Sequence, residues 1–134
     1  MNEKLILTND GSHSLYSHKI NETYHSIHGA ILEAKHVFIQ NGFSEVKKSN
    51  VNILEVGFGT GLNALLTCQK ARQKRVKVNY HSIELYPITK KTYLQLNFTD
   101  LIGLEKKDLS ILHSCPWEKK QNINPFFSLT KIHS

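Results

Sequence analysis

The sequence predicts an α/β fold whose parallel β-sheet begins but does not finish within the 134 residues. Three observations predict it: residues 51–73 read as an apolar strand, a glycine turn and a helix, residues 76–84 as a second strand with an acidic end, and residues 126–132 as a third strand. Strands that alternate with helices favour a parallel sheet.

The N-terminal part predicts a β-hairpin followed by a helix. Residues 5–8 and 12–17 flank the turn sequence Asn9-Asp10-Gly11, which is typical of a hairpin. Residues 24–30 lead into a helix that runs to about residue 40, with apolar positions at helical spacing that predict core packing. Asn41-Gly42 is a helix stop signal, and residues 44–50 form a polar linker into the central strand.

The glycines at positions 57, 59 and 61 stand between the first parallel strand and its helix. Glycine adopts positive φ angles and lets a ligand reach bare backbone, so this turn predicts a cradle at a helix N-terminus. Its spacing, G-x-G-x-G without a following lysine, fits neither the dinucleotide fingerprint nor the P-loop. The turn therefore indicates a nucleoside-like cofactor rather than a phosphate.

Two acidic residues accompany the glycine turn. Glu55 stands two positions before Gly57, and Glu84 follows Gly61 by 23 positions, at the end of the second strand. This is about the offset at which a carboxylate in a βαβ unit accepts hydrogen bonds from a ribose. Glu84 alone could be a solvated strand end, but with the glycine turn it favours a nucleoside site.

The remaining elements complete the predicted order. Pro87 suits the first turn of a helix over residues 87–98, and a shorter helix over 108–113 ends before Cys115-Pro116. Parallel strands joined by helices bury both faces of a sheet, so three strands leave an open edge at residues 126–132. We expect from this edge that sequence is missing.

Composition indicates a globular protein with a basic surface. Seventeen Lys and Arg against eleven Asp and Glu give a net charge of +6, and 40% of residues are hydrophobic. A basic surface favours a polyanion but also fits simple solubility, and cations at the end of helix 62–73 also complement its dipole. No signal core or membrane span is apparent, which predicts a cytoplasmic protein. Cys68, Cys115 and the eight histidines lack the spacing of a metal site or disulfide framework.

Longer segments resemble a known family. They are D-G-S-H-S-L-Y-S at 10–17, Y-H-S-I-H-G-A-I-L-E-A-K-H-V-F-I at 24–39, I-L-E-V-G-F-G-T-G-L-N at 53–63, I-E-L-Y-P at 83–87, and P-W followed by P-F-F-S-L within 116–129. The acid-x-G-x-G-x-G pattern resembles motif I of class I S-adenosylmethionine methyltransferases. Together the segments resemble the tRNA wobble-uridine methyltransferases, which include the methyltransferase half of the bifunctional MnmC and the stand-alone MnmD.

The resemblance implies a Rossmann-like class I methyltransferase that uses S-adenosylmethionine. Its reaction would methylate the aminomethyl nitrogen of the tRNA wobble uridine, so that the 5-aminomethyl nucleoside becomes 5-methylaminomethyl-2-thiouridine. By this resemblance Glu55, Gly57, Gly59 and Gly61 form the cofactor loop and Glu84 holds the ribose. Four residues match the segment that borders the cofactor pocket: Tyr24, Ser26, Gly29 and Glu33. For Glu33, an ordinary surface carboxylate remains the alternative.

The sequence also departs from the family pattern. The family continues into an acidic residue near the adenine and a D-A-F-x-P segment whose Asp lies at the target amine, and neither occurs in residues 1–134. The resemblance therefore implies an N-terminal, cofactor-binding part of a methyltransferase domain, weakly active or inactive alone and without the oxidoreductase domain of the bifunctional enzymes. The alternative is a non-catalytic basic module that binds RNA or a partner protein. A nicotinamide dehydrogenase is disfavoured by the glycine spacing.

Overall fold

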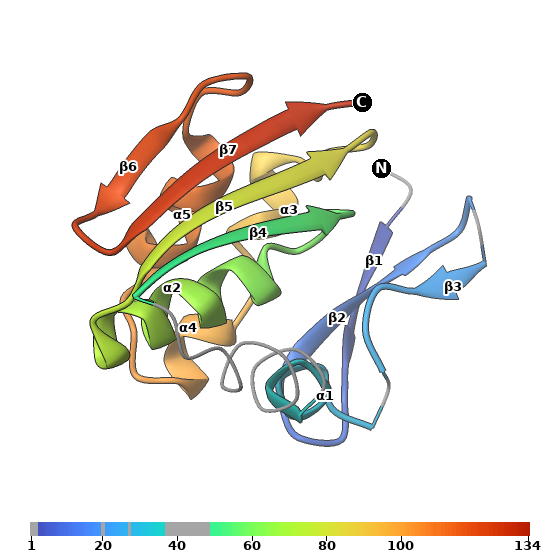
Figure 1. Ribbon diagram of the computed structural model, residues 1–134. Helices are drawn as coiled ribbons and strands as arrows, with labels where there is room; N and C mark the ends of the chain where they lie inside the picture. The colour runs from blue at the N-terminus through green and yellow to red at the C-terminus, as the bar shows by residue number, and fades with distance from the viewer. Residues whose placement is uncertain (1–2, 20, 27, 37–48) are drawn as a thin grey trace.

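The computed structural model describes residues 3–19, 21–26, 28–36 and 49–134. An N-terminal antiparallel unit packs beside a four-stranded sheet with helices behind it (Figure 1). In chain order the elements are β1 Glu3–Leu7, β2 His13–Ser17, β3 Glu22–Thr23, α1 Ala30–Ala34, β4 Asn50–Val56, α2 Leu62–Lys74, β5 Lys77–Glu84, α3 Lys90–Tyr93, α4 Phe98–Leu101, α5 Lys106–Ser114, β6 Gln121–Asn124 and β7 Phe127–His133.

The predicted N-terminal hairpin is confirmed. β1 and β2 pair antiparallel, and the short β3 joins the other edge of β2. The Asp10 carboxylate accepts hydrogen bonds from the backbone N–H groups of Ser12 and Leu32, each at 2.9 Å, so the hairpin turn also holds α1. A Cβ atom at Gly29 would lie 2.7 Å from Asp10 Oδ2, which explains a glycine just before α1.

The first predicted helix is only partly described. α1 begins at Ala30, and its residues Ala30, Ile31 and Ala34 are buried, as the helical spacing predicts. The predicted continuation of this helix beyond residue 36, the Asn41-Gly42 stop and most of the 44–50 linker lie outside the described residues.

The three predicted parallel strands are confirmed, but the predicted sheet edge is wrong. β4 pairs with β5 and β5 with β7, both in parallel, while β6 pairs antiparallel with the far side of β7. β7 is therefore an inner strand, and the sheet is mixed. β6 escaped prediction because its sequence, Q-N-I-N, is short and polar; a turn in which Phe126 N donates to Asn124 Oδ1 at 2.8 Å folds it back on β7.

The predicted helix over residues 87–98 is only partly confirmed, because α3 covers just Lys90–Tyr93 and a second short helix, α4, begins at Phe98. α3 begins after Thr89, whose hydroxyl oxygen accepts a hydrogen bond from Thr92 N at 3.3 Å. Asn97 then breaks the helical path: its side chain accepts from His13 N and donates to Gly11 O, both at 2.8 Å. These two bonds attach the hairpin to the helical side of the sheet. The next helix is close to prediction, since α5 spans Lys106–Ser114.

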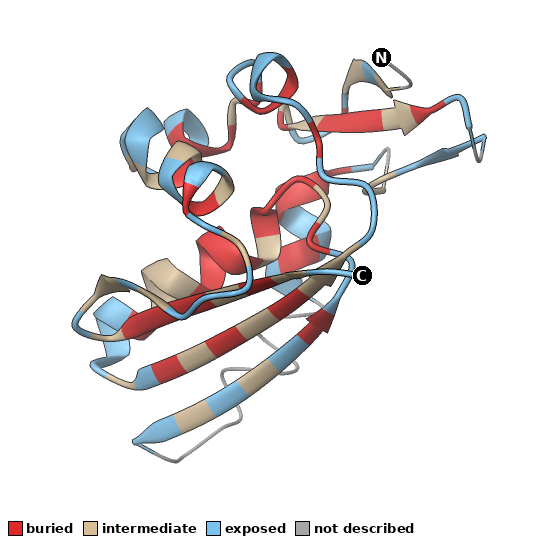
Figure 2. Ribbon diagram, turned by 90° about the horizontal axis from the view of Figure 1, so that it is seen from above, coloured by how far each residue is buried: buried red, intermediate tan, exposed pale blue. Residues whose placement is uncertain are grey.

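The core lies between the sheet and its helices. Val78 and Tyr80 of β5 and Leu129 of β7 are buried against α2 and α5. On the other face of the sheet, Leu54 and Val56 of β4 are 66% and 81% exposed, and none of the described helices covers them (Figure 2). None of the helices in the described part of the chain could span a lipid bilayer.

Candidate functional site

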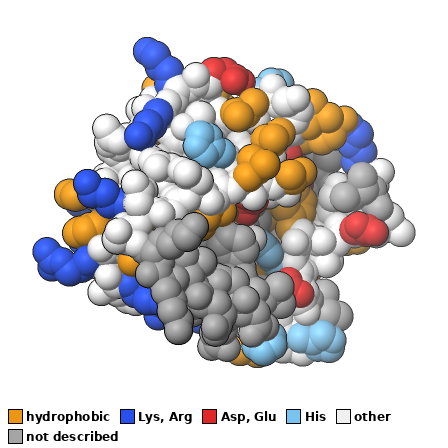
Figure 3. All heavy atoms as spheres, in the orientation of Figure 1, with side chains coloured by type: hydrophobic (Ala, Val, Ile, Leu, Met, Phe, Trp, Pro, Cys, Tyr) orange, Lys and Arg blue, Asp and Glu red, His pale blue; other side chains and the backbone are white. Residues whose placement is uncertain are grey.

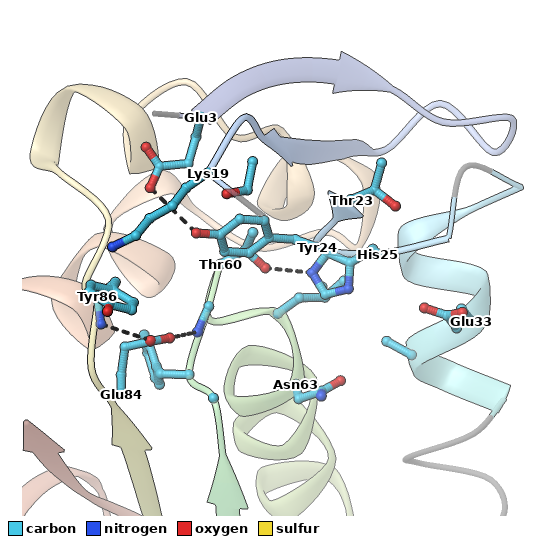
Figure 4. Close-up of a pocket in the computed structure, with 16 residues that line it drawn as sticks. Glu3, Lys19, Thr23, Tyr24, His25, Glu33, Thr60, Asn63, Glu84 and Tyr86 are labelled. Carbon is cyan, nitrogen blue, oxygen red and sulfur yellow. Dashed lines mark hydrogen bonds between the residues drawn. The ribbon is translucent and has the colours of Figure 1, made fainter. Parts of the chain in front are cut away.

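A cavity of about 610 Å³ opens where β4 and β5 end, between the sheet and the N-terminal unit (Figure 4). Its size is typical of a site for a small molecule or cofactor. The sheet side contributes the glycine turn and the end of β5, while the N-terminal unit contributes residues from β1 to α1. Ligands of open α/β sheets bind at this edge, outside the carboxyl ends of the parallel strands.

The glycine turn has a backbone that glycine adopts readily. Gly57, Gly59 and Gly61 have φ angles of 91°, 57° and 81°. A Cβ atom at Gly57 would meet no atom within 4 Å, and one at Gly59 would lie 3.3 Å from the Tyr24 ring. Gly57 and Gly59 line the cavity, so a ligand could approach bare backbone there. Gly61 instead serves as the N-cap of α2.

Glu84 lies beside this turn, at the end of β5. Its Oε1 atom accepts a hydrogen bond from Gly59 N at 2.7 Å, and its Oε2 atom accepts one from Tyr86 N at 3.1 Å. A carboxylate carries about four acceptor positions, so Glu84 keeps capacity for hydroxyl groups of a ligand. The structure thus brings the two predicted features, the glycine turn and the second acid, into direct contact.

Two of the four predicted N-terminal residues line the cavity. Tyr24 packs over Gly59, and burial together with the charges of Glu3 and Glu84 raises the pKa of its phenol to about 12. Glu33 reaches the cavity from α1 and accepts a hydrogen bond from Ser26 N at 3.2 Å. Ser26 and Gly29 lie outside the cavity lining, where Ser26 Oγ accepts a hydrogen bond from His28 N.

Glu55 points away from the cavity, into the helix-covered side of the sheet. It is only 8% exposed and accepts a hydrogen bond from Ser82 Oγ at 2.8 Å. Burial raises the pKa of its carboxyl group. In the structure, Glu55 supports the strand beneath the turn and does not line the cavity.

Sequence reasoning missed several lining residues. His25 Nε2 lies 2.7 Å from the hydroxyl of Thr60, the residue between Gly59 and Gly61, and burial lowers the pKa of this imidazole. Lys19 holds its ammonium 3.9 Å from the ring centre of Tyr86. His25 adjoins Tyr24, and Tyr86 follows Glu84 by two positions, so their neighbours were the available signal.

The cavity is acidic although the chain is basic. Three carboxylates line it, from Glu3, Glu33 and Glu84, beside the single lining lysine, Lys19. Such a lining favours a neutral or cationic ligand over a phosphate. Among the described residues, no group of three or more His, Cys, Asp or Glu side chains is arranged to hold a metal ion.

The fold and the cavity define an α/β protein with a cavity of small-molecule size beside a glycine turn. Comparison with known proteins gives the relatives. A protein of Cupriavidus metallidurans, "tRNA 5-methylaminomethyl-2-thiouridine biosynthesis bifunctional protein MnmC", is 38% identical over 98 residues, which are 69% of this chain and 14% of that protein. The protein of the same name from Leptospira interrogans is 31% identical over 104 residues, 70% of this chain and 16% of that protein. These matches confirm the resemblance to MnmC, and the chain is homologous to a segment of these proteins.

A solved structure supports the fold. The crystal structure of MNMC2 from Aquifex aeolicus matches 98% of this chain and 42% of its own with a TM-score of 0.70 and 22% sequence identity. No family model matches the chain. The chain therefore spans a minor part of each of these relatives.

Proposed function

We propose that this chain is the cofactor-binding part of a Rossmann-like class I methyltransferase domain, which uses S-adenosylmethionine to methylate the aminomethyl nitrogen of the tRNA wobble uridine. The observation that carries the proposal is the contact of Glu84 with the N–H of Gly59, at the edge of the cavity. The proposed substrate is taken from the names of the MnmC relatives, which refer to biosynthesis of 5-methylaminomethyl-2-thiouridine in tRNA. The proposed setting is the cytoplasm.

The lining residues fit this cofactor. Open space in front of Gly57 leaves room for a nucleoside against the backbone. Glu84 would accept hydrogen bonds from the ribose diol, whereas Glu33 and Glu3 complement a positively charged sulfonium and ammonium. When bound, S-adenosylmethionine would supply an electrophilic methyl group.

The chain's own contribution would be positioning. Transfer of a methyl group to a neutral amine needs in-line alignment of donor and acceptor more than it needs a strong acid. Tyr24, held between Gly59 and Glu3, would close the cavity on the cofactor side and exclude water. His25 has a lowered pKa and so stays neutral near pH 7, where it would avoid repelling a cationic ligand.

Calorimetric titration tests the cofactor proposal. S-adenosylmethionine and its product S-adenosylhomocysteine are titrated into the purified chain, and NADH is tested as a competitor. We expect binding that NADH does not displace, and at least a tenfold loss of affinity in Glu84→Gln. Asp100→Asn is the matched control, since Asp100 is exposed on α4 and outside the cavity lining.

The alternative, a non-catalytic basic module for RNA or a protein partner, predicts a different result. A folded chain that binds neither compound, or a Glu84→Gln variant that binds as well as the unchanged chain, would contradict the cofactor proposal. Thermal unfolding of each variant shows that it is folded before the comparison is made.

A further inference from the structure

Six cationic residues lie at the end of the sheet where the strands begin, away from the cavity. They occupy the last turn of α2 and its cap, the start of β5 and the first turn of α5, and we term them the basic rim: Arg72, Lys74, Arg75, Lys77, Lys106 and Lys107. All six are exposed. Figure 3 shows Lys and Arg side chains gathered along this side of the molecule, at the left in the view of Figure 1.

The end of α2 lies beside the beginning of α5. Gln69 of α2 donates a hydrogen bond to the carbonyl oxygen of Ile102 at 3.0 Å. The helices α2 and α5 are also in direct contact. The cations at the two helix ends therefore form one surface.

Helix stability explains only part of this surface. Arg72 and Lys74 complement the dipole of α2 at its C-terminus, but Lys106 and Lys107 stand in the first turn of α5, where the dipole disfavours a cation. The ion pair of Lys107 with Glu105, 3.4 Å long, joins side chains that are 77% and 74% exposed, and such pairs contribute little stability. The lysines of α5 thus suggest a role outside folding.

The cavity itself is unsuited to a polyanion. Its carboxylates, Glu3, Glu33 and Glu84, would repel phosphates, and its lysine, Lys19, already contacts Tyr86. An RNA whose base enters the cavity therefore needs cations elsewhere. The thirteen residues of α2 run from the glycine turn to the basic rim, a distance of about 20 Å at the usual rise of a helix, which a folded RNA arm can span.

We propose that the basic rim binds the phosphate backbone of the tRNA whose modified base is presented to the cavity. This inference rests on the proposed function and extends it to a second, sequence-independent contact. Phosphate contacts fix the register of a nucleic acid on a protein without reading its bases. The rim would accordingly raise affinity for tRNA without changing affinity for the cofactor.

Salt-dependent binding tests the basic rim. Fluorescence anisotropy measures the affinity of unfractionated tRNA for the unchanged chain, for Lys77→Gln with Lys106→Gln, and for the matched pair Lys119→Gln with Lys120→Gln. The matched pair removes the same charge from exposed lysines outside the rim. We expect the rim pair to weaken binding about five- to tenfold and to reduce the slope of log K against log salt by about one to two, and the matched pair to change affinity less than twofold.

Equal loss of affinity in both pairs, or none in the rim pair, would overturn the proposal. S-adenosylmethionine affinity, measured on the same preparations, separates the two proposals. A rim effect on tRNA in a chain that does not bind the cofactor would refute the proposed cofactor site and leave the rim supported. Cofactor binding with no rim effect would refute the rim alone.

Discussion

The imidazole of His113 donates a hydrogen bond from Nε2 to the carbonyl oxygen of Thr60 across 2.7 Å. A carbonyl oxygen only accepts, so Nε2 carries the proton. The same ring stacks on Tyr93 with 4.5 Å between ring centres, and burial lowers its pKa to about 4. α5 thereby supports the glycine turn from the side opposite the cavity.

This buried histidine predicts a loss of stability in acid. The pKa of His113 is about 4 in the folded chain and 6.5 in the unfolded chain, so the unfolded chain binds the proton first as the pH falls. The full stability is present above pH 6.5, and about 3 kcal/mol of it is lost between pH 6.5 and 4. Urea unfolding at several pH values should show a shallower decline in His113→Gln. An equal decline in both proteins would contradict this role; His25 contributes with the same sign but remains in both.

We expect two substitutions of Lys131 to differ in their effect on stability. Its side chain is 1% exposed in the inner strand β7, and Nζ donates to the carbonyl oxygen of His113 at 2.5 Å. Burial lowers the pKa of this ammonium group. Lys131→Met keeps the packed stem and removes a buried charge, so we expect a change within about 1 kcal/mol, whereas Lys131→Ala leaves a cavity and should cost about 2–4 kcal/mol. Denaturant unfolding measures both; an equal loss would mean that the ammonium, not the stem, matters.

We expect Gly57→Ala to weaken ligand binding more than its effect on stability would explain. Gly57→Ala and Gly11→Ala meet the same strain, since both glycines have similar φ angles, 91° and 86°, and open space at the Cβ position. Each should cost about 1–2 kcal/mol of stability. Only the methyl group at position 57 enters the cavity, so S-adenosylmethionine affinity measured by calorimetry should fall in Gly57→Ala alone. Equal affinities in the two variants would place the ligand elsewhere.

Asn97 predicts a loss of contact between the hairpin and the sheet. Asn97→Ala removes the partners of His13 N and Gly11 O and should cost about 1–3 kcal/mol. Amide hydrogen exchange should accelerate at His13 while it changes little within β5. Asn122→Ala, on an exposed position of β6, is the control and should leave both rates unchanged. Unchanged exchange at His13 in Asn97→Ala would show that other contacts hold the hairpin.

The fold was predictable where one local signal dominated. The turn Asn9-Asp10-Gly11 predicted the hairpin, and the glycine turn marked the boundary between β4 and α2, both of which the structure confirms. Prediction failed where contacts with residues far away in the sequence determine the local structure. Asn97 is bonded to residues more than eighty positions away, so the break between α3 and α4 has no local cause in the sequence. β6 exists because β7 offers it an edge, which its own polar sequence does not reveal.

The residues of the candidate site were likewise predictable from local spacing and unpredictable where distant contacts place them. Spacing alone singled out the glycine turn and Glu84, and the structure brings them into contact. The position of Glu55 depended on which face of β4 it occupies, and the alternation of β4 turns it toward the helices. The contact of His25 with Thr60 joins two segments 35 positions apart, which no spacing rule within either segment could predict.

The position of the cavity between two parts of the chain bears on the order of folding. The hairpin closes a short loop and forms in about 1–10 μs, whereas parallel strands and contacts such as Asn97 with Gly11 must close long loops and form later. The walls of the cavity meet only when these late contacts are made, as with Tyr24 against Gly59. A ligand that fills the cavity would therefore bind only the fully assembled chain and slow the separation of the two cavity walls. The lifetime of the folded state would then grow with ligand concentration.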